Sequence, residues 1–89
     1  MTMQQQKPAP SRDSMDIVVG RNVHMLMWDR HMTQAQMGDV LGLEQSALGR
    51  KLRGKRGWSL DEVAAAAEFF GVAFAELCTP RDLNPEPTD

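Results

Sequence analysis

The sequence predicts an all-α fold, a compact bundle of four to five short helices. Apolar residues recur at the three- and four-residue spacing of amphipathic helices, and glycines follow the segments with this spacing. Two Ser/Thr-x-x-Glu/Gln sequences can form capping boxes at helix starts. No run of alternating β-branched residues indicates a strand. At 89 residues, the chain has room for one hydrophobic core and therefore for one domain.

The expected domain covers residues 16–78 and lies between two tails. Residues 1–15 are rich in glutamine and contain two prolines, and residues 79–89 combine three prolines with acidic side chains. Both segments have too few apolar residues to order themselves, so we expect two flexible tails.

The first two helices have recognisable start and stop signals. The first is expected to run from Asp16, its N-cap, to about Arg30. The second opens with the capping box Thr33–Gln36 and ends at Gly42, because glycine readily adopts the left-handed conformation found after helices.

The third helix, Gln45 to Arg53, has two inward-facing apolar residues, Leu48 and Leu52, four positions apart. Its other side chains are small, polar or positively charged. We therefore expect this helix to be held on one side and to present the other side to solvent.

The fourth helix begins at the capping box Ser59–Glu62, and its alanines and phenylalanines make it the core helix. A last short helix over residues 73–77 is expected to bring Phe74 and Leu77 back onto that core.

Charge is distributed unevenly along a chain whose formal net charge is only −2. Residues 17–58 carry a net charge of +4 and residues 59–89 a net charge of −6. The run from Arg50 to Arg56 holds five positive side chains and no acid. Such a local field can attract a polyanion, although a solvated basic face would have the same composition.

Several classes of function lack support in the residues. No apolar stretch reaches the roughly 18 residues of a membrane helix, and the polar N-terminus lacks a secretory signal, so we expect a cytoplasmic protein away from membranes. Cys78 is the only cysteine, and His24 and His31 have no partners at metal-ligand spacing, so we expect no metal and no cofactor. No nucleophile triad, carboxylate pair or phosphate loop indicates an enzyme.

Residues 34–54 read QAQMGDVLGLEQSALGRKLRG, which describes two short helices joined by a glycine-containing turn. This stretch resembles the helix-turn-helix of the lambda-repressor and Cro family of phage and bacterial regulators. The similarity extends over residues 17–77. Gly38 takes the family's small-residue position, Gly42 its turn glycine and Leu48 its buried anchor.

The resemblance implies a sequence-specific DNA-binding transcription regulator, a repressor, whose helix 45–53 enters the major groove. It places Gln45, Ser46, Gly49 and Arg50 at the base edges. A glutamine amide can bind adenine in bidentate fashion, and an arginine can bind guanine in the same way.

The same resemblance assigns a contact with the DNA backbone to Gln34. The cations that continue past the end of the third helix are better placed for phosphates than for bases, so we expect backbone contacts from Lys51, Arg53, Lys55 and Arg56. Gln34 is also expected to brace the recognition helix. Because one helix reads only a few base pairs, we expect a homodimer on an inverted repeat in double-stranded DNA.

Apolar residues in the first helix leave a second interpretation open. Met25, Met27 and Trp28 either pack in the core or form a dimer or partner surface. In the latter case the chain can be a protein-interaction module, such as an antitoxin-like subunit. Trp58 and the last helix are equally good candidates for a dimer surface.

Overall fold

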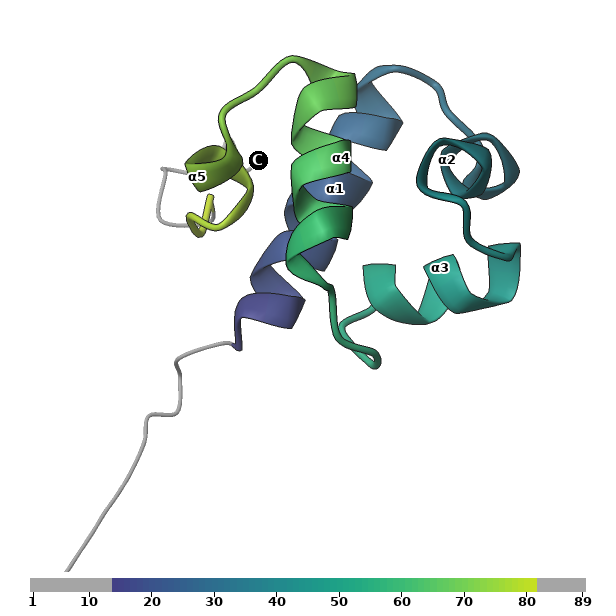
Figure 1. Ribbon diagram of the computed structural model, residues 1–89, viewed down its shortest axis with the longest axis horizontal. Helices are drawn as coiled ribbons and strands as arrows, with labels where there is room; N and C mark the ends of the chain where they lie inside the picture. Colours follow the sequence, from purple (N-terminus) through teal and green to yellow (C-terminus); the bar gives the residue numbers. More distant parts are fainter. Residues whose placement is uncertain (1–13, 82–89) are drawn as a thin grey trace, which may run out of the picture.

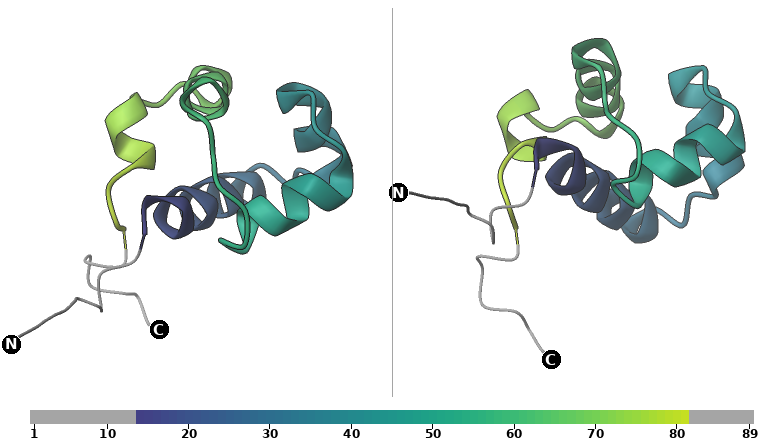
Figure 2. Two further views of the ribbon diagram at one scale, coloured as in Figure 1. Left: turned by 60° about the horizontal axis from the view of Figure 1, so that its bottom comes forward. Right: turned by 90° about the horizontal axis from the view of Figure 1, so that it is seen from below.

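The computed structural model describes residues 14–81, and within them the chain forms five α-helices and no strand. α1 (Met15–Asp29) and α4 (Leu60–Phe70) form the centre. α2 (Gln34–Leu41) and α3 (Gln45–Leu52) lie on one side of them, and α5 (Phe74–Leu77) lies on the other (Figure 1, Figure 2). The predicted all-helical bundle is confirmed. None of these helices is long and apolar enough to cross a membrane.

A single cluster of buried apolar side chains joins the five helices. Its members are Val19, Val23, Met27, Met37, Leu48, Leu52, Val63, Ala66, Ala67, Phe70 and Leu77. α1, α3 and α4 contribute residues at helical spacing, and α2 and α5 contribute one residue each, Met37 and Leu77. The prediction that Leu48 and Leu52 anchor α3 is therefore confirmed.

The predicted signals at the helix ends are largely confirmed. The hydroxyl of Thr33 accepts from the Gln36 N–H, and that of Ser59 accepts from the Glu62 N–H, both at 3.0 Å. Both glutamine and glutamate side chains return the bond, which completes the two capping boxes. The predicted helix end at Gly42 also forms, with a φ of 70°.

The start of α1 differs from the prediction. The helix begins at Met15, and Ser14 is its N-cap, with its hydroxyl accepting from the Ile17 N–H at 3.3 Å. Asp16 is not the cap, because it lies within the first turn of the helix; its carboxylate accepts from the Trp58 N–H at 2.8 Å. The domain therefore begins inside the predicted N-terminal tail, and residues 1–13 of that tail lie outside the described residues.

The C-terminal boundary also lies further along the chain than predicted. The buried side-chain amide of Asn22 donates to the carbonyls of Leu77 and Thr79, at 2.9 and 3.0 Å. These bonds attach the chain after α5 to α1, so Thr79 belongs to the domain. The remainder of the predicted tail, residues 82–89, lies outside the described residues.

The structure divides the large apolar side chains between core and surface. Met27 is buried, so its assignment to a partner surface is wrong. The interpretation that Met25 and Trp28 pack in the core is wrong, because these side chains are 45% and 79% exposed. Phe74, expected in the core, is exposed as well, because the four-residue helix α5 turns Leu77 inward instead.

α1 and α3 approach each other closely at Gly20. A Cβ atom at this position would meet the backbone carbonyl oxygens of Lys51 and Leu52, the latter at 2.9 Å. Backbone atoms cannot rotate away as a side chain can. The absence of a side chain at Gly20 therefore determines how closely α3 lies against α1.

We expect Gly20→Ala to destabilise the fold by about 2 kcal/mol, because steric overlap with two carbonyls outweighs the gain in helix propensity. Gly49→Ala is the matched control, since it also lies in a helix but its Cβ would meet only side-chain atoms, at 3.1 Å and beyond. Urea denaturation of both variants measures the difference. Equal stability of the two variants would show that the α1–α3 spacing adapts.

Candidate nucleic-acid interface

The exposed face of α3 follows from the helical period. Leu48 and Leu52 define the inward direction, and at about 100° per residue the positions on the opposite side point to solvent. Ser46 and Arg50 lie on this side and are exposed. Arg53 is exposed at the C-terminal end of the helix, and Gln45, three positions before Leu48, is exposed at its start. The structure thus brings together two polar and two cationic side chains of the predicted set on one accessible surface.

Gly49 lies on the same face but is buried. A Cβ atom at this position would lie 3.1 Å from Oε1 of Gln34 and 3.4 Å from a guanidinium nitrogen of Arg53. Two side chains therefore cover this part of the backbone, and the placement of Gly49 among the base-contacting residues is not supported. Its missing side chain instead lets Gln34, the first residue of α2, lie against α3.

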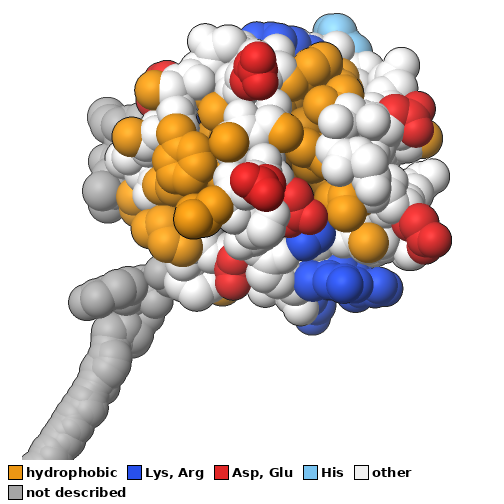
Figure 3. Space-filling model, viewed as in Figure 1, with side chains coloured by type: hydrophobic (Ala, Val, Ile, Leu, Met, Phe, Trp, Pro, Cys, Tyr) orange, Lys and Arg blue, Asp and Glu red, His pale blue; other side chains and the backbone are white. Residues whose placement is uncertain are grey.

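The basic loop after α3 begins with a reversal of the chain at Gly54, whose φ is 74°. The Lys55 N–H donates to the Arg50 carbonyl at 2.8 Å, and the Gly54 N–H donates to the Lys51 carbonyl at 3.1 Å. This pair of bonds ends the helix and requires a left-handed residue. Lys55 and Arg56 are exposed beyond it, and Figure 3 shows lysine and arginine side chains gathered at this end of α3.

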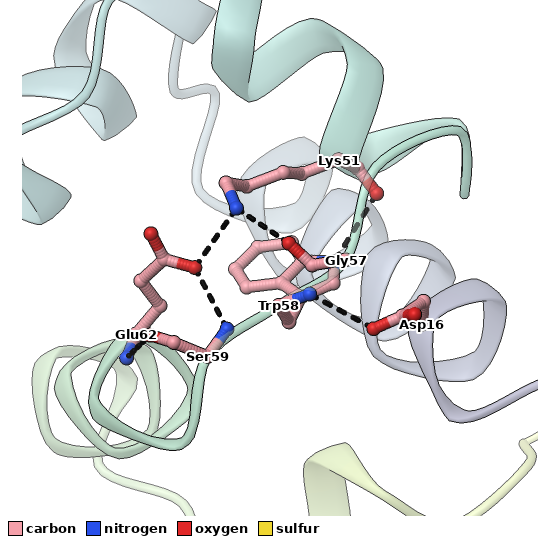
Figure 4. A network of polar contacts seen from close by, with 6 residues as sticks. All are labelled: Asp16, Lys51, Gly57, Trp58, Ser59 and Glu62. Atoms are coloured by element: carbon pink, nitrogen blue, oxygen red, sulfur yellow. Dashed lines mark hydrogen bonds and ion pairs between the residues drawn. The ribbon is translucent and has the colours of Figure 1, made fainter.

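Lys51 points into the molecule, so its predicted outward position is wrong. Its side chain is 7% exposed, and its ammonium lies 3.0 Å from Oε1 of Glu62. The ammonium also donates to the Gly57 carbonyl (Figure 4). The helical period accounts for this position, because Lys51 lies one turn after Leu48, on the inward side of α3. A lysine used in this way is not available to a phosphate.

Trp58 completes the contacts that hold the loop (Figure 4). Its indole N–H donates to the Lys51 carbonyl at 3.1 Å, and its backbone N–H donates to Asp16 of α1 at 2.8 Å. Residues of α1, α3 and α4 thereby fix the loop that carries Lys55 and Arg56. Trp58 is half-buried in this arrangement, which speaks against its use as a dimer surface.

The carboxylate of Glu62 has two structural roles: it accepts from the Ser59 N–H at the start of α4, and it pairs with the Lys51 ammonium. Burial alone would raise its pKa, but the Ser59 N–H and the Lys51 ammonium stabilise the charged form and leave the pKa below its ordinary value. A carboxylate whose pKa is lowered in the fold stabilises the protein at pH values above its ordinary pKa. This stabilisation is lost as the pH falls through the lowered pKa.

The fold and the presented face of α3 define the class of protein: a helix-turn-helix domain of the lambda-repressor type, with α2 and α3 as the motif. The chain belongs to the BetR domain family, a helix-turn-helix family whose model matches residues 14–88. The family resemblance inferred from residues 34–54 is thereby confirmed.

Solved structures of transcription regulators share this fold. The hypothetical transcription factor NHTF from Neisseria superposes with a TM-score of 0.71 at 18% identity, over 88% of this chain and 90% of that one. The clp gene regulator ClgR from Corynebacterium glutamicum has a TM-score of 0.68 at 17% identity, over 79% and 71%. The restriction-modification controller protein C.AhdI from Aeromonas hydrophila has a TM-score of 0.62 at 24% identity, over 70% and 94%. No curated protein matches the chain significantly in sequence.

We expect Glu62→Gln to lower the free energy of unfolding by about 1–3 kcal/mol at pH 7, because the buried Lys51 ammonium loses its counter-charge. The difference from the wild type is expected to vanish at acidic pH, where the carboxyl of Glu62 is itself protonated. Denaturation curves between pH 7 and pH 3 measure this dependence.

Glu76→Gln is the matched control for this experiment. Glu76 accepts from the Ala73 N–H at 2.8 Å and so occupies the same capping position in α5, away from Lys51. If the control variant loses as much stability as Glu62→Gln, with the same pH dependence, the ion pair with Lys51 contributes nothing.

Proposed function

We propose that the protein is a sequence-specific DNA-binding transcription regulator that inserts α3 into the major groove. The observation that carries this proposal is the exposed face of α3, on which Gln45, Ser46 and Arg50 stand beside a basic loop held in place from behind. An α-helix fits the major groove, and base pairs are distinguishable there by their donors and acceptors. The three solved structures are those of a gene regulator, a controller protein and a hypothetical transcription factor, which supports the same function.

The exposed residues divide into base readers and backbone contacts. Gln45, Ser46 and Arg50 carry amide, hydroxyl and guanidinium groups that suit base edges, and Arg50 is the first choice for a guanine contact. Arg53, Lys55 and Arg56 lie at the end of α3 and beyond, where cations suit phosphates. Gln34 is half-buried against α3, which supports its proposed role of bracing the helix while it bonds a phosphate.

We expect Arg50→Ala to relax base preference at one position of each half-site, a loss of about 1–3 kcal/mol in discrimination. Lys55→Ala is the matched control, because it removes one exposed cation from the same surface. It is expected to weaken binding to all sequences equally and to reduce the slope of log affinity against log salt by about one.

Selection of sites from a random duplex library, at two salt concentrations, measures both variants against the wild type. A uniform loss of affinity in Arg50→Ala would make Arg50 a phosphate contact. Absence of any enriched sequence for the wild type, with binding that disappears as salt rises, would overturn sequence-specific recognition altogether.

We further propose that the regulator is a repressor that binds an inverted repeat as a homodimer, with half-sites about 34 Å apart. The aromatic side chains Phe69 of α4 and Phe74 of α5 are exposed, although phenylalanine is commonly buried. α5 lies on the side of α4 away from α3, and apolar side chains gather over it (Figure 1, Figure 3). A dimer formed there leaves both recognition helices free.

We expect Phe74→Glu to convert a dimer into a monomer, because it places a charge in the apolar contact. Trp28→Ala removes an exposed aromatic residue on α1 and serves as the matched control, with the dimer retained. Sedimentation equilibrium measures the mass of each variant. A Phe74→Glu protein that remains dimeric would exclude this face as the interface.

A further inference from the structure

A second surface of the molecule lies where the C-terminal end of α3 meets α1 (Figure 2). Residues of α1 and of the end of α3 line a groove there, which is open to solvent and has a volume of about 440 Å³. Its apolar lining comes from Ile17, Met25 and Trp28 of α1 and from Leu52 of α3. This volume is within the range of small binding pockets.

The groove face of α1 is separate from its core face. Ile17, Met25 and Trp28 recur at helical spacing on the side opposite the buried residues Val19 and Val23. Trp28 has the largest exposed fraction of the large apolar side chains in residues 14–81. An exposed tryptophan beside a groove is the side-chain type that most often anchors a protein partner.

The charge of the groove indicates the chemistry of that partner. His24 and Arg53 are exposed among its lining residues, and no carboxylate is among them. A complementary ligand therefore carries acidic groups around an apolar anchor. A phosphate backbone satisfies only the first requirement, because it has nothing to place against Trp28 and Met25.

We propose that the α1–α3 groove is a docking site for an acidic segment of a protein partner. A bulky apolar side chain of the segment packs against Trp28, and its carboxylates face His24 and Arg53. Arg53 also belongs to the proposed DNA-backbone contacts, so the acidic segment and DNA compete for it. This competition rests on the proposed function, whereas docking in the groove does not.

The test uses a phage-displayed library of random peptides selected against the full chain without DNA. Enriched peptides are expected to combine acidic residues with an aromatic or large aliphatic residue. Their affinity is expected to fall at least 10-fold in Trp28→Ala and to stay unchanged in Leu60→Ala, which removes an exposed apolar side chain outside the groove. No enrichment, enriched peptides without acidic residues, or binding that ignores Trp28→Ala would overturn the docking site.

Two measurements on Trp28→Ala distinguish the other occupants. A change in sedimentation mass would assign the groove to a second copy of the chain, and a loss of affinity for duplex DNA would assign it to the nucleic acid. Either result overturns the proposal.

Competition is tested last, with an enriched peptide and the duplex selected for the wild type. We expect saturating duplex to weaken peptide binding at least 10-fold. Unchanged peptide binding would refute the competition alone, whereas absence of a selected duplex would refute the proposed function and leave the docking result standing.

Discussion

The ammonium of Lys51 is buried, and the surface proposed to meet DNA depends on how that charge is satisfied. A buried ammonium is costly unless it is paired and hydrogen-bonded, and here Glu62 and the Gly57 carbonyl meet both requirements. Each partner comes from a different part of the chain: Glu62 from the start of α4, Gly57 from the basic loop. One charge therefore sets the path of the loop between α3 and α4. The exposed cations Lys55 and Arg56 belong to this loop, so their position depends on its path.

Local signals in the sequence predicted much of this fold. The capping boxes at Thr33 and Ser59 and the helix end at Gly42 depend on residues three or four positions apart, so they can be recognised without the tertiary structure. The inward turn of Lys51 could also have been predicted, because its position relative to Leu48 follows from the helical period. Residue type was misleading there, since lysine is seldom buried.

Other features depend on contacts between distant segments and leave little trace in the sequence. Gly20 resembles any helical glycine until the carbonyls of Lys51 and Leu52 lie against it. In the sequence, Asn22 resembles an ordinary surface residue. In the fold, its side-chain amide donates hydrogen bonds to backbone carbonyls more than fifty positions away. The same holds for Trp28, because α1 is apolar around much of its circumference and its sequence alone does not say which side chains enter the core.

The division of α1 into two apolar faces has a consequence for the proposed function. Val19, Val23 and Met27 provide the core contacts that the fold requires, so Trp28 and Met25 are not needed for it and remain exposed. Exposed aromatic surface favours association, and in a small domain it lies close to every other functional surface. Here the groove beside Trp28 ends at Arg53, the residue that also covers Gly49 on the presented face of α3. Any ligand that moves Arg53 therefore also changes the surface proposed to meet DNA, so the two proposed binding events are physically coupled through this residue.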